Sequence, residues 1–490
     1  MGSDWKSIEL DKLITKRNQG VNTTTEKVKY SPEGISVIRA NNIIPGRIDF
    51  QDCVFVDEQT FSRIKQACKP KKGDVLYTNI GSQFGTAVKV DVDFTIAWNV
   101  LRIQTSKELD ADFLVYLLNN PINKRYIQSL NYSSTMPFVS GKVVGGISFK
   151  LPNIEEQLKI RNALISFDKK IELNRQTNQT LEQMAQTLFK SWFVDFDPVF
   201  DKLLAKIDFD LTKLPSDFPE VLQKRAQKRL LVLNSEVGAA TKIKAKASLQ
   251  AMVQSDSSTD ISNASTNDSV VNIHQYFPSE FEHNEQLGWI PKGWESGQID
   301  THAKIEMGQS PKGDTYNDSG VGTPLVNGPV EFGPYFTKQS KWTTSPTKLS
   351  KKNDLIVCVR GSTTGRYVKS NGEYCLGWGV CSIRGKKSQA FTDQLYKYSI
   401  REMLGLTTGS TFPNWSRQTL SEFKSIVPSA EALQLFDELV APKIEKVEIG
   451  VIESQSLTQL RDTLLPKLIS GELQIPDAIE TIKTQTVNRR

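Results

Sequence analysis

Two short proline-containing segments come closest to a pattern that could act on a nucleic-acid base. Methylation of adenine at N6 uses an Asn/Asp-Pro-Pro-aromatic loop, which grips the extruded base and its amino group. The candidates are residues 197–200 (DPVF) and 119–122 (NNPI), and neither has the second proline. The sequence also lacks a Gly-x-x-x-x-Gly-Lys-Ser/Thr loop for nucleotide phosphates. It therefore predicts no catalytic residue, neither for methyl transfer nor for ATP-driven movement.

The residue types that bind metals do not occur at metal-binding spacings. The three histidines (His274, His283 and His302) fit no common zinc-site or catalytic-triad pattern. The five cysteines include no Cys-x-x-Cys pair and are odd in number, which argues against a structural zinc and against a disulfide framework. We therefore expect reduced, mostly buried thiols, no metal ion, and no cofactor bound by this chain.

Length and composition indicate a multidomain globular protein. The 490 residues are too many for one ordinary domain, and 38% hydrophobic with 24% charged residues is typical of soluble domains with a core. The net charge of +6 permits a polyanionic partner without establishing one. The sequence has no apolar run of membrane-spanning length and no secretory pattern at its start, so we expect a cytoplasmic protein with no membrane contact.

The chain contains an internal repeat. Residues 71–104 and 351–384 align without a gap, and eleven of the 34 positions are identical. After a four-residue shift the repeat continues, with residues 134–137 (STMP) matching 410–413 (STFP). The sequence therefore predicts two copies of one unit, each a mixed domain followed by a helix.

Each domain is expected to be rich in strands. Short β-prone runs begin at Asp74 and Asp354, and each leads through a Gly-Ser-x-x-Gly turn into another strand. Glycine at both ends of the turn allows tight or positive-φ backbone geometry. A helical stretch from Asp112 to Leu118 makes the predicted class α+β.

A long helix with heptad spacing follows each domain. Apolar or uncharged residues recur at alternating steps of four and three between charged and amide side chains, as in the seam of a coiled coil. The seam positions are Ile160, Leu164, Phe167, Ile171, Asn174, Asn178, Leu181, Ala185, Leu188 and Trp192 in the first copy, and Phe436, Val440, Val447, Leu457, Leu464 and Leu468 in the second. Both seams are polar or small at their middle, where Gly450 and Ser454 correspond to Asn174 and Asn178.

The two helices are predicted to pair with each other in an antiparallel, pseudo-two-fold coiled coil, because a two-fold-like repeat places one domain at each end. A buried polar layer costs stability but fixes the register of such a pair. Some forty helical residues span about 60 Å, which can hold two domains well apart. The alternative is that each helix packs only on its own domain.

These features divide the chain into six segments. The expected order is a first mixed domain (1–151), a first long helix (152–198), a connecting segment (199–286), a second mixed domain (287–427), a second long helix (428–473) and a C-terminal tail (474–490). Residues at about 235–272 of the connecting segment are rich in Ser, Thr, Asn and Asp, which predicts a flexible linker.

Three stretches resemble the specificity subunits of type I restriction–modification systems. Residues 155–198 (EEQLKIRNALISFDKKIELNRQTNQTLEQMAQTLFKSWFVDFDP) resemble the central conserved region of that family. Residues 277–295 (FPSEFEHNEQLGWIPKGWE) resemble the lead-in to its second target-recognition domain, and residues 460–473 (LRDTLLPKLISGEL) its distal conserved region.

The resemblance implies a division of labour. Each target-recognition domain would read one half of a bipartite double-stranded DNA site, and the helices would set the spacing. The helices would also dock two methyltransferase subunits, which bind S-adenosylmethionine and methylate adenine at N6, and translocating restriction subunits would join later. This chain would then be a non-catalytic subunit. A fused methyltransferase with its own reader and a helical scaffold that never touches DNA are the alternatives.

On this interpretation the two Gly-Ser turns are the natural place for DNA contacts. The shared part would hold phosphates, and the differing part would read bases, since Arg pairs with guanine and Asn or Gln with adenine. The predicted contacts are Thr78, Asn79, Gly81, Ser82 and Gln83 in the first copy, and Arg360, Gly361, Ser362, Thr363, Thr364 and Arg366 in the second. The alternative is an ordinary hairpin turn.

Further loops carry the same residue types. One group of predicted contacts is Arg39, Asn41 and Asn42 in the first copy, with Asn327 near the corresponding place in the second copy. Another group is Ser134 and Thr135 in the first copy, with Ser410, Thr411, Asn414 and Arg417 in the second. Lys312 is a further predicted contact. A solvated loop is the alternative for each. Trp98 and Trp378 recur beside apolar strands, so we predict that they pack in the core rather than stack on bases.

Overall fold

The chain folds into two compact units, each of which contains one half of both long helices. The computed structural model describes residues 5–81, 84–91, 94–131, 136–235, 273–407 and 413–475. The first unit comprises Met1–Arg175 and Ile452–Arg490, and the second comprises Gln176–Val451. Within the described residues, none of the helices combines the length and the apolar character that a membrane crossing needs.

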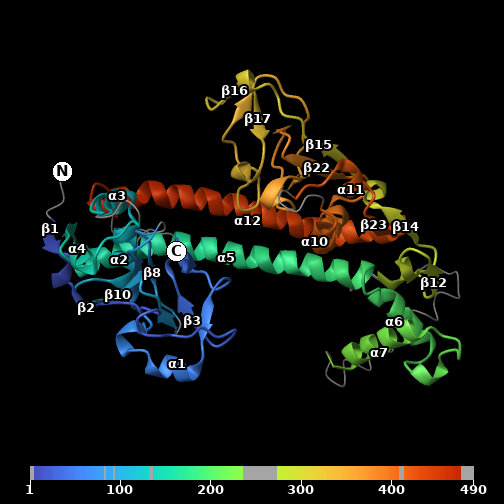
Figure 1. Cartoon of the computed structure of the whole chain (residues 1–490), viewed down its shortest axis with the longest axis horizontal. Coiled ribbons are helices and arrows are strands. Elements are labelled where there is room, and N and C mark those ends of the chain that lie inside the picture. Colours follow the sequence, from blue (N-terminus) through green and yellow to red (C-terminus); the bar gives the residue numbers. More distant parts are fainter. Residues whose placement is uncertain are drawn as a thin grey trace, which may run out of the picture. The chain divides into compact units, whose positions relative to one another are not determined.

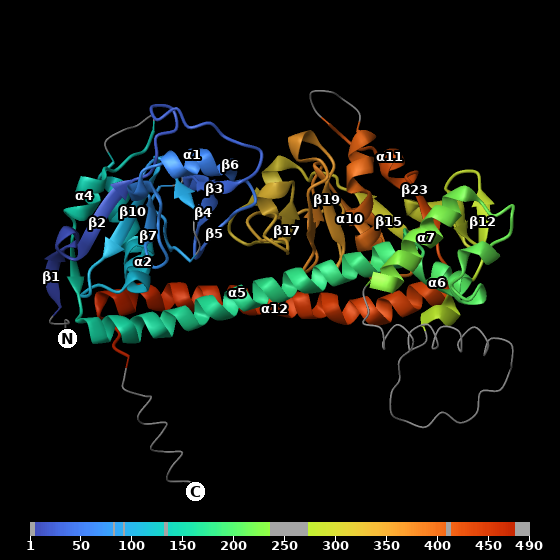
Figure 2. The same ribbon diagram turned by 90° about the horizontal axis from the view of Figure 1, so that it is seen from below.

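A four-stranded antiparallel sheet forms the centre of the first unit, with strand order β2-β10-β7-β8 (Figures 1 and 2). These strands are β2 (Ile14–Gln19), β10 (Val100–Thr105), β7 (Val75–Thr78) and β8 (Ala87–Lys89). The apolar β7 is buried along its whole length. Helix α2 (Ala111–Asn119) packs against β7 and β8, and Asp110 caps it by accepting a hydrogen bond from the Phe113 amide at 2.9 Å.

Smaller elements complete the first unit. A three-stranded sheet has the order β6 (Val54–Val56), β3 (Ile35–Ile38) and β9 (Thr95–Ile96), in which β3 and β9 are parallel. Two further antiparallel pairs are β1 (Lys6–Glu9) with β11 (Ser148–Leu151), and β4 (Ile43–Ile44) with β5 (Arg47–Ile48). The remaining helices are α1 (Glu58–Arg63), α3 (Pro121–Ser129) and α4 (Gly141–Gly145).

The second unit repeats this topology. Its main sheet has the order β15 (Ala303–Met307), β22 (Val380–Gly385), β19 (Leu355–Cys358) and β20 (Tyr367–Lys369). The pair β14 (Glu295–Gln298) and β23 (Lys424–Val427) corresponds to β1 and β11, and the parallel pair β17 (Thr323–Val326) and β21 (Cys375–Leu376) corresponds to β3 and β9. The prediction of two copies of one α+β unit is confirmed.

The copies differ at their periphery. One helix, α10 (Gln389–Gly405), stands where the first unit has α2 and α3. The second unit also contains the antiparallel strands β16 (Tyr316–Asn317) and β18 (Trp342–Thr343) and the hairpin of β12 (Phe281–Asn284) and β13 (Gly288–Pro291). Its short helices are α9 (Ile299–His302) and α11 (Arg417–Ser421).

One acidic residue of the repeat has a structural role in both copies. Asp74 accepts hydrogen bonds from the Lys71 amide at 2.7 Å and from Arg102 Nε at 2.6 Å. Asp354 binds the Lys351 amide at 2.9 Å and both Nε and a terminal nitrogen of Arg384 at 2.7 Å. These buried carboxylates therefore tie the start of β7 and of β19 to the neighbouring strand.

The long helices are α5 (Ile154–Phe193) and α12 (Ala430–Ser470), and they pair antiparallel. In the first unit, Asp168 accepts a hydrogen bond from Arg461 at 2.6 Å, and further along α5 the Asn174 side chain donates to Ser454 Oγ at 3.3 Å. Residue numbers thus rise along one helix as they fall along the other. In the second unit the rings of Trp192 and Phe436 lie 5.9 Å apart and continue the same direction of pairing.

The heptad seam is the contact surface of this helix pair. Every predicted seam position is buried or half-buried, including the polar Asn174, which is 7% exposed. Toward the ends of the seam the helices also join the domain cores, since Ile160, Leu164 and Leu468 belong to the core of the first unit. The helices therefore pack both on each other and on their domains, and the two alternatives are not exclusive.

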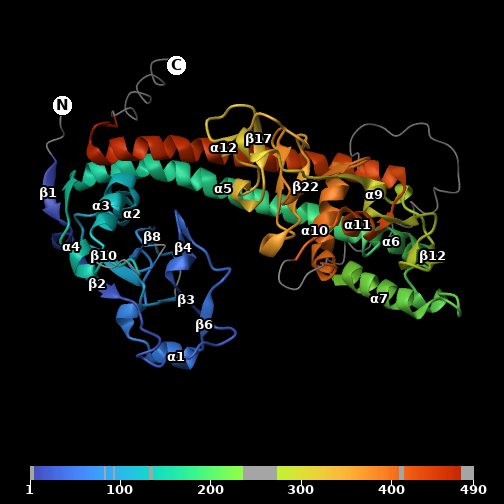
Figure 3. The ribbon, with the colours of Figure 1, turned by 45° about the horizontal axis from the view of Figure 1, so that its top comes forward.

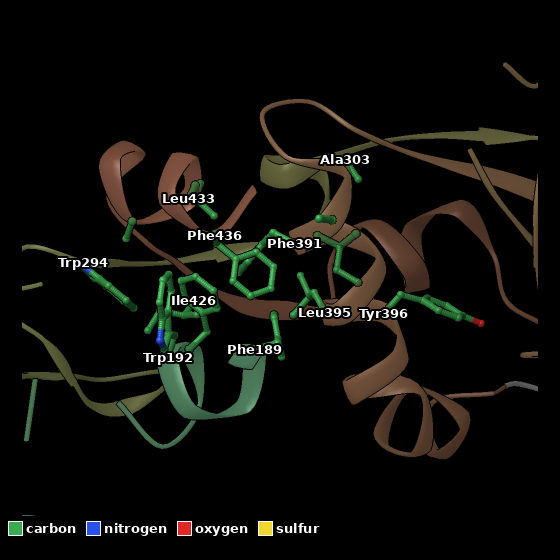
Figure 4. Packing of buried hydrophobic residues seen from close by; sticks show 14 of the residues in the cluster. Phe189, Trp192, Trp294, Ala303, Phe391, Leu395, Tyr396, Ile426, Leu433 and Phe436 are labelled. Atoms are coloured by element: carbon green, nitrogen blue, oxygen red, sulfur yellow. The ribbon is translucent and has the colours of Figure 1, made fainter. Parts of the chain in front are cut away.

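Aromatic residues form the centre of the second unit. Figure 4 shows Phe189 and Trp192 of α5 gathered around Phe436 of α12. Phe391 of α10 lies against the ring of Phe193 at 4.9 Å, so this cluster joins the helix pair to the domain core.

The segment expected only to connect the copies is itself partly folded. It forms α6 (Asp197–Lys206) and α7 (Glu220–Ser235) (Figure 3). The apolar residues Phe200, Leu222 and Ala226 of these helices belong to the core of the second unit. Of the expected linker, residues 236–272 lie outside the described residues, as does the tail from residue 476.

Removing the Phe436 ring should destabilise the second unit more than an exposed truncation on the same helix. Phe436→Ala leaves a cavity in a fully buried aromatic cluster and should lower the free energy of unfolding by about 3–5 kcal/mol. Ile449→Ala, whose side chain is 59% exposed, is the matched control and should change it by about 0.5 kcal/mol or less. Chemical denaturation followed by tryptophan fluorescence measures both, and equal effects would contradict the packing described.

Candidate nucleic-acid interface

The Gly-Ser turns that follow β7 in the first unit and β19 in the second have the same backbone geometry. Gly81 and Gly85 have φ of 99° and 94°, and Gly361 and Gly365 have φ of 76° and 90°. These are left-handed conformations that side chains with a Cβ rarely adopt. The recurrence of glycine in the repeat therefore reflects the turn, as its sequence indicated.

Each turn is joined to the proline of the Ser-Thr-x-Pro motif. The Gly81 amide donates to the Pro137 carbonyl at 2.8 Å, and the Gly361 amide donates to the Pro413 carbonyl at 2.9 Å. In the second unit Arg360 also forms an antiparallel bridge with Asn414. In the second unit, two loop clusters that the sequence identified separately thus lie side by side.

A helix supports the far end of each turn. In the first unit Gln128 Nε2 donates to the Phe84 carbonyl at 3.1 Å, and the Lys124 ammonium donates to Thr86 at 3.1 Å. Burial lowers the pKa of Lys124. In the second unit the Tyr396 hydroxyl of α10 donates to the Gly365 carbonyl at 3.0 Å. The turns are therefore held at both ends.

Trp98 and Trp378 are exposed, so the prediction that they pack in the core is wrong. The exposed fractions are 38% and 61%, respectively. Trp98 lies in the turn between β9 and β10, and Trp378 lies in the equivalent turn between β21 and β22. Because each tryptophan comes just after a buried strand ends, its side chain lies outside the core. Their backbones are still fixed, because the Trp98 carbonyl accepts a hydrogen bond from Gln19 and the Trp378 carbonyl accepts one from Arg360.

The remaining predicted clusters lie beside these tryptophans. The Ala40 amide, next to Arg39, donates to Asn99 Oδ1 at 3.3 Å. In the second unit the Gly377 amide donates to the Val326 carbonyl at 2.8 Å, which places Asn327 beside Trp378. The Trp378 amide donates to Ser310 Oγ at 3.0 Å, two residues before Lys312. The loops that the sequence identified therefore meet around one exposed tryptophan in each unit.

Three of the predicted DNA contacts are buried, which corrects their assignment. Asn42, Thr78 and Asn79 are 2% exposed or less. The Asn79 side chain forms a reciprocal amide pair with Gln19, at 2.9 and 3.2 Å, and donates to the Val139 carbonyl at 3.1 Å. The Asn42 amide group bonds the Arg39 and Asp49 backbones. These side chains hold the loops in shape and do not reach a base edge in this conformation.

Other predicted contacts are accessible. Those with exposed side chains are Asn41, Lys312, Ser362, Arg366 and Arg417. Those that are half-buried are Arg39, Gly81, Asn327, Arg360, Gly361, Thr363, Thr364 and Asn414. The predictions for Ser82, Gln83, Ser134, Thr135, Ser410 and Thr411 fall outside the described residues.

Two polar residues that hold this region together were missed by the sequence analysis. Gln19 is the last residue of β2 and directly precedes Gly20, whereas Ser310 lies two residues after Gly308, which follows β15. A Cβ at Gly20 would lie 2.2 Å from the Ala97 carbonyl, and one at Gly308 would lie 2.0 Å from the Gly377 carbonyl. These glycines let the chain pass close to the tryptophan turn. Extending the repeat alignment would have identified this pair of glycines, although the two polar side chains do not occupy equivalent positions beside it.

The region contains thiols, charged side chains and amides. All five cysteines of the chain are free thiols, and burial raises the pKa of Cys358 beneath the turn to about 11, so that it stays a neutral thiol at pH 7. The described residues contain no group of His, Cys, Asp and Glu side chains placed to hold a metal ion. Positive side chains, amides and one exposed indole in each unit instead match the residue types that contact nucleic acids.

Known proteins are similar to this chain over most of its length. A family model described as "Type I restriction modification DNA specificity domain" matches residues 2–183 and 291–452. The chain is 27% identical over 429 residues to the type I restriction enzyme HindI specificity subunit of Haemophilus influenzae, covering 82% of this chain and 87% of that one. It is 23% identical over 381 residues to the MjaIX specificity subunit of Methanocaldococcus jannaschii, covering 75% and 70%, respectively.

A solved structure has the same fold. It is the crystal structure of the type I restriction–modification S subunit from M. genitalium, with a TM-score of 0.50 and 15% sequence identity. The match covers 95% of this chain and 96% of that one.

The left-handed glycine of the turn can be tested directly. Gly361→Ala places a Cβ in open space but in a left-handed conformation, so it should cost about 1–2 kcal/mol of stability. Gly405→Ala, also in open space but at the end of α10 without a left-handed φ, should leave stability unchanged or slightly raised. The midpoint of chemical denaturation measures the difference, and two equal midpoints would argue against the described turn.

Proposed function

Because this chain belongs to the type I restriction–modification DNA specificity family, we propose that each of its two recognition domains reads one half of a bipartite site in double-stranded DNA. The chain is a specificity subunit of such a system. The observation that carries the proposal is a pair of equivalent loop regions. Their turns have the same backbone geometry, but several of their side chains differ. At the turn, Ile80 and Thr86 of the first unit correspond to Arg360 and Arg366 of the second.

A common backbone with different side chains is suited to two domains that recognise different DNA sequences. Phosphates are the same in every half-site, so residues that hold them can recur between copies. Base edges differ, so the residues that read them must differ. Accordingly, we assign phosphate contacts to the shared turn backbone, and base contacts to accessible side chains that differ between the units, such as Asn41, Arg360 and Arg366. We also assign a phosphate contact to Lys312, because a lysine ammonium binds phosphate as a point charge.

We assign the spacing function to α5 and α12. Both helices contribute to both units, and forty residues of helix extend about 60 Å. The pair also offers exposed polar and apolar side chains along its length, among them Leu173 and Ile452 at more than half exposure. Two methyltransferase subunits would dock on these helices, and the restriction subunits would join the complex through them.

We further propose that catalysis resides in those partners and not in this chain. The two segments that came closest to a methylation loop have structural roles here. Val199 and Phe200 of the DPVF segment are buried in the core, and Asn119 of the NNPI segment pairs with the Ala87 backbone through both of its side-chain groups. S-adenosylmethionine would accordingly bind the methyltransferase subunits.

Cofactor binding separates this proposal from a fused methyltransferase. Calorimetric titration of the purified chain with S-adenosylmethionine should show no binding, whereas the complex with its methyltransferase subunits should bind it. Saturable binding by the chain alone would overturn the non-catalytic assignment. A failure of the complex to shift duplex DNA in a salt-dependent, sequence-selective manner would favour a scaffold that never touches DNA.

Arg360→Ala tests the assignment of one domain to one half-site. In complex with the methyltransferase subunits, the variant should weaken recognition of one half-site by about 1–3 kcal/mol and leave the other unchanged. Competition binding with duplexes altered in either half measures this. Lys228→Ala removes an exposed charge on α7 and is the matched control, which should leave both half-sites unaffected. An equal loss on both half-sites would contradict the assignment.

A further inference from the structure

The side chain of Arg360 is held in place by Trp378. The guanidinium carbon lies 3.7 Å from the centroid of the indole ring, which is the geometry of a cation–π contact. The Arg360 Nε donates a hydrogen bond to the carbonyl of the same tryptophan at 3.1 Å. The two contacts together restrain the position of the guanidinium group over the indole ring.

The backbones of both residues are also fixed. The Val359 amide, beside Arg360, donates to the Gly379 carbonyl at 2.9 Å, and the Gly361 amide on the other side donates to the Pro413 carbonyl. The Trp378 amide is held by Ser310 Oγ at 3.0 Å. A stacked pair on so restrained a backbone loses little conformational freedom when a ligand binds.

The outer part of the arginine remains available. Within the described part of the chain, Arg360 forms no ion pair, and its two terminal nitrogens have no hydrogen-bond partner. Trp378 is 61% exposed, so the pair lies at the surface. A planar guanidinium that uses only its Nε in such a bond can donate two parallel hydrogen bonds from its terminal nitrogens.

We propose that the stacked pair of Arg360 and Trp378 reads a guanine in the half-site recognised by the second domain. This inference rests on the proposed function. Arginine donating two bonds to O6 and N7 is the commonest specific contact to guanine, and it requires the guanidinium orientation that the indole imposes. Trp378 is then a positioning residue, acting on the base through Arg360.

The comparison between the two copies favours a base over a phosphate as the ligand. Trp98 recurs in the first unit, but the position equivalent to Arg360 is the buried Ile80. There Gln19, and not an arginine, donates to the tryptophan carbonyl. A phosphate contact would serve both half-sites equally, whereas an arginine in only one copy is suited to a base present in only one half-site.

The test is the base preference of the complex with its methyltransferase subunits, measured as methylation of a duplex library randomised within both half-sites. The wild-type complex should require guanine at one position of one half-site, and Arg360→Ala should abolish that requirement. Trp378→Ala should reduce the preference for that guanine about tenfold, while Trp378→Phe, which keeps an aromatic face, should retain most of it. Trp98→Ala is the matched control and should leave this position unchanged.

Combining the Arg360 and Trp378 substitutions distinguishes a positioning role of Trp378 from a merely structural one. In the Arg360→Ala background, Trp378→Ala should have no further effect on base preference at this position. An additive effect, or a loss of affinity without any change in base preference, would overturn the guanine assignment while leaving two separate half-sites intact. Loss of selectivity in both half-sites at once would instead contradict the proposed function.

Discussion

The close approach of two antiparallel helices at their polar middle is the constraint on which the rest of the structure depends. A Cβ at Gly450 would lie 2.7 Å from Asn178 Oδ1, so the Asn178 side chain packs directly against the backbone of the facing helix. In the adjacent layer the Asn174 side chain donates to Glu453 at 2.8 Å and to Ser454. Shifting either helix by one turn would bury these amides against apolar neighbours without partners, which is costly. The polar layers therefore fix the register that an all-apolar seam would leave free.

The helix pair is continuous with the cores of both units. The seam ends enter the domain cores, through Ile160 and Leu164 in the first unit and through Trp192 and Phe436 in the second. Each core orders a main sheet, and the sheet in turn ends in the Gly-Ser turn and the tryptophan turn. The loops can therefore differ in their side chains between the two units, while the packing of the helices and sheets that hold them stays the same.

Much of this was predictable because it follows from periodicity. The repeat gave two domains of one topology, and the steps of four and three identified the buried seam, including Asn174. The left-handed glycines followed from the turn pattern. These features depend on residues near one another in sequence, or on a spacing that a helix imposes whatever it packs against.

The loop side chains were less predictable because their surroundings come from distant segments. Asn79 has the right type for reading adenine, but Gln19 and Val139, each sixty residues away, occupy its amide group. Trp98 and Trp378 neighbour apolar strands as core residues do, and only their place just beyond the strand end exposes them. Sequence pattern gives the residue type and the turn, whereas exposure is decided by tertiary contacts.

We propose that two domains of one fold read two different half-sites, and that the long helices set the gap between those half-sites. Mapping methylated adenines across a genome that carries the complete system tests this claim most directly. The predicted result is one bipartite motif with two dissimilar half-sites, separated by a non-specific gap of constant length. A single continuous motif, two identical half-sites, or a gap of variable length would contradict the account.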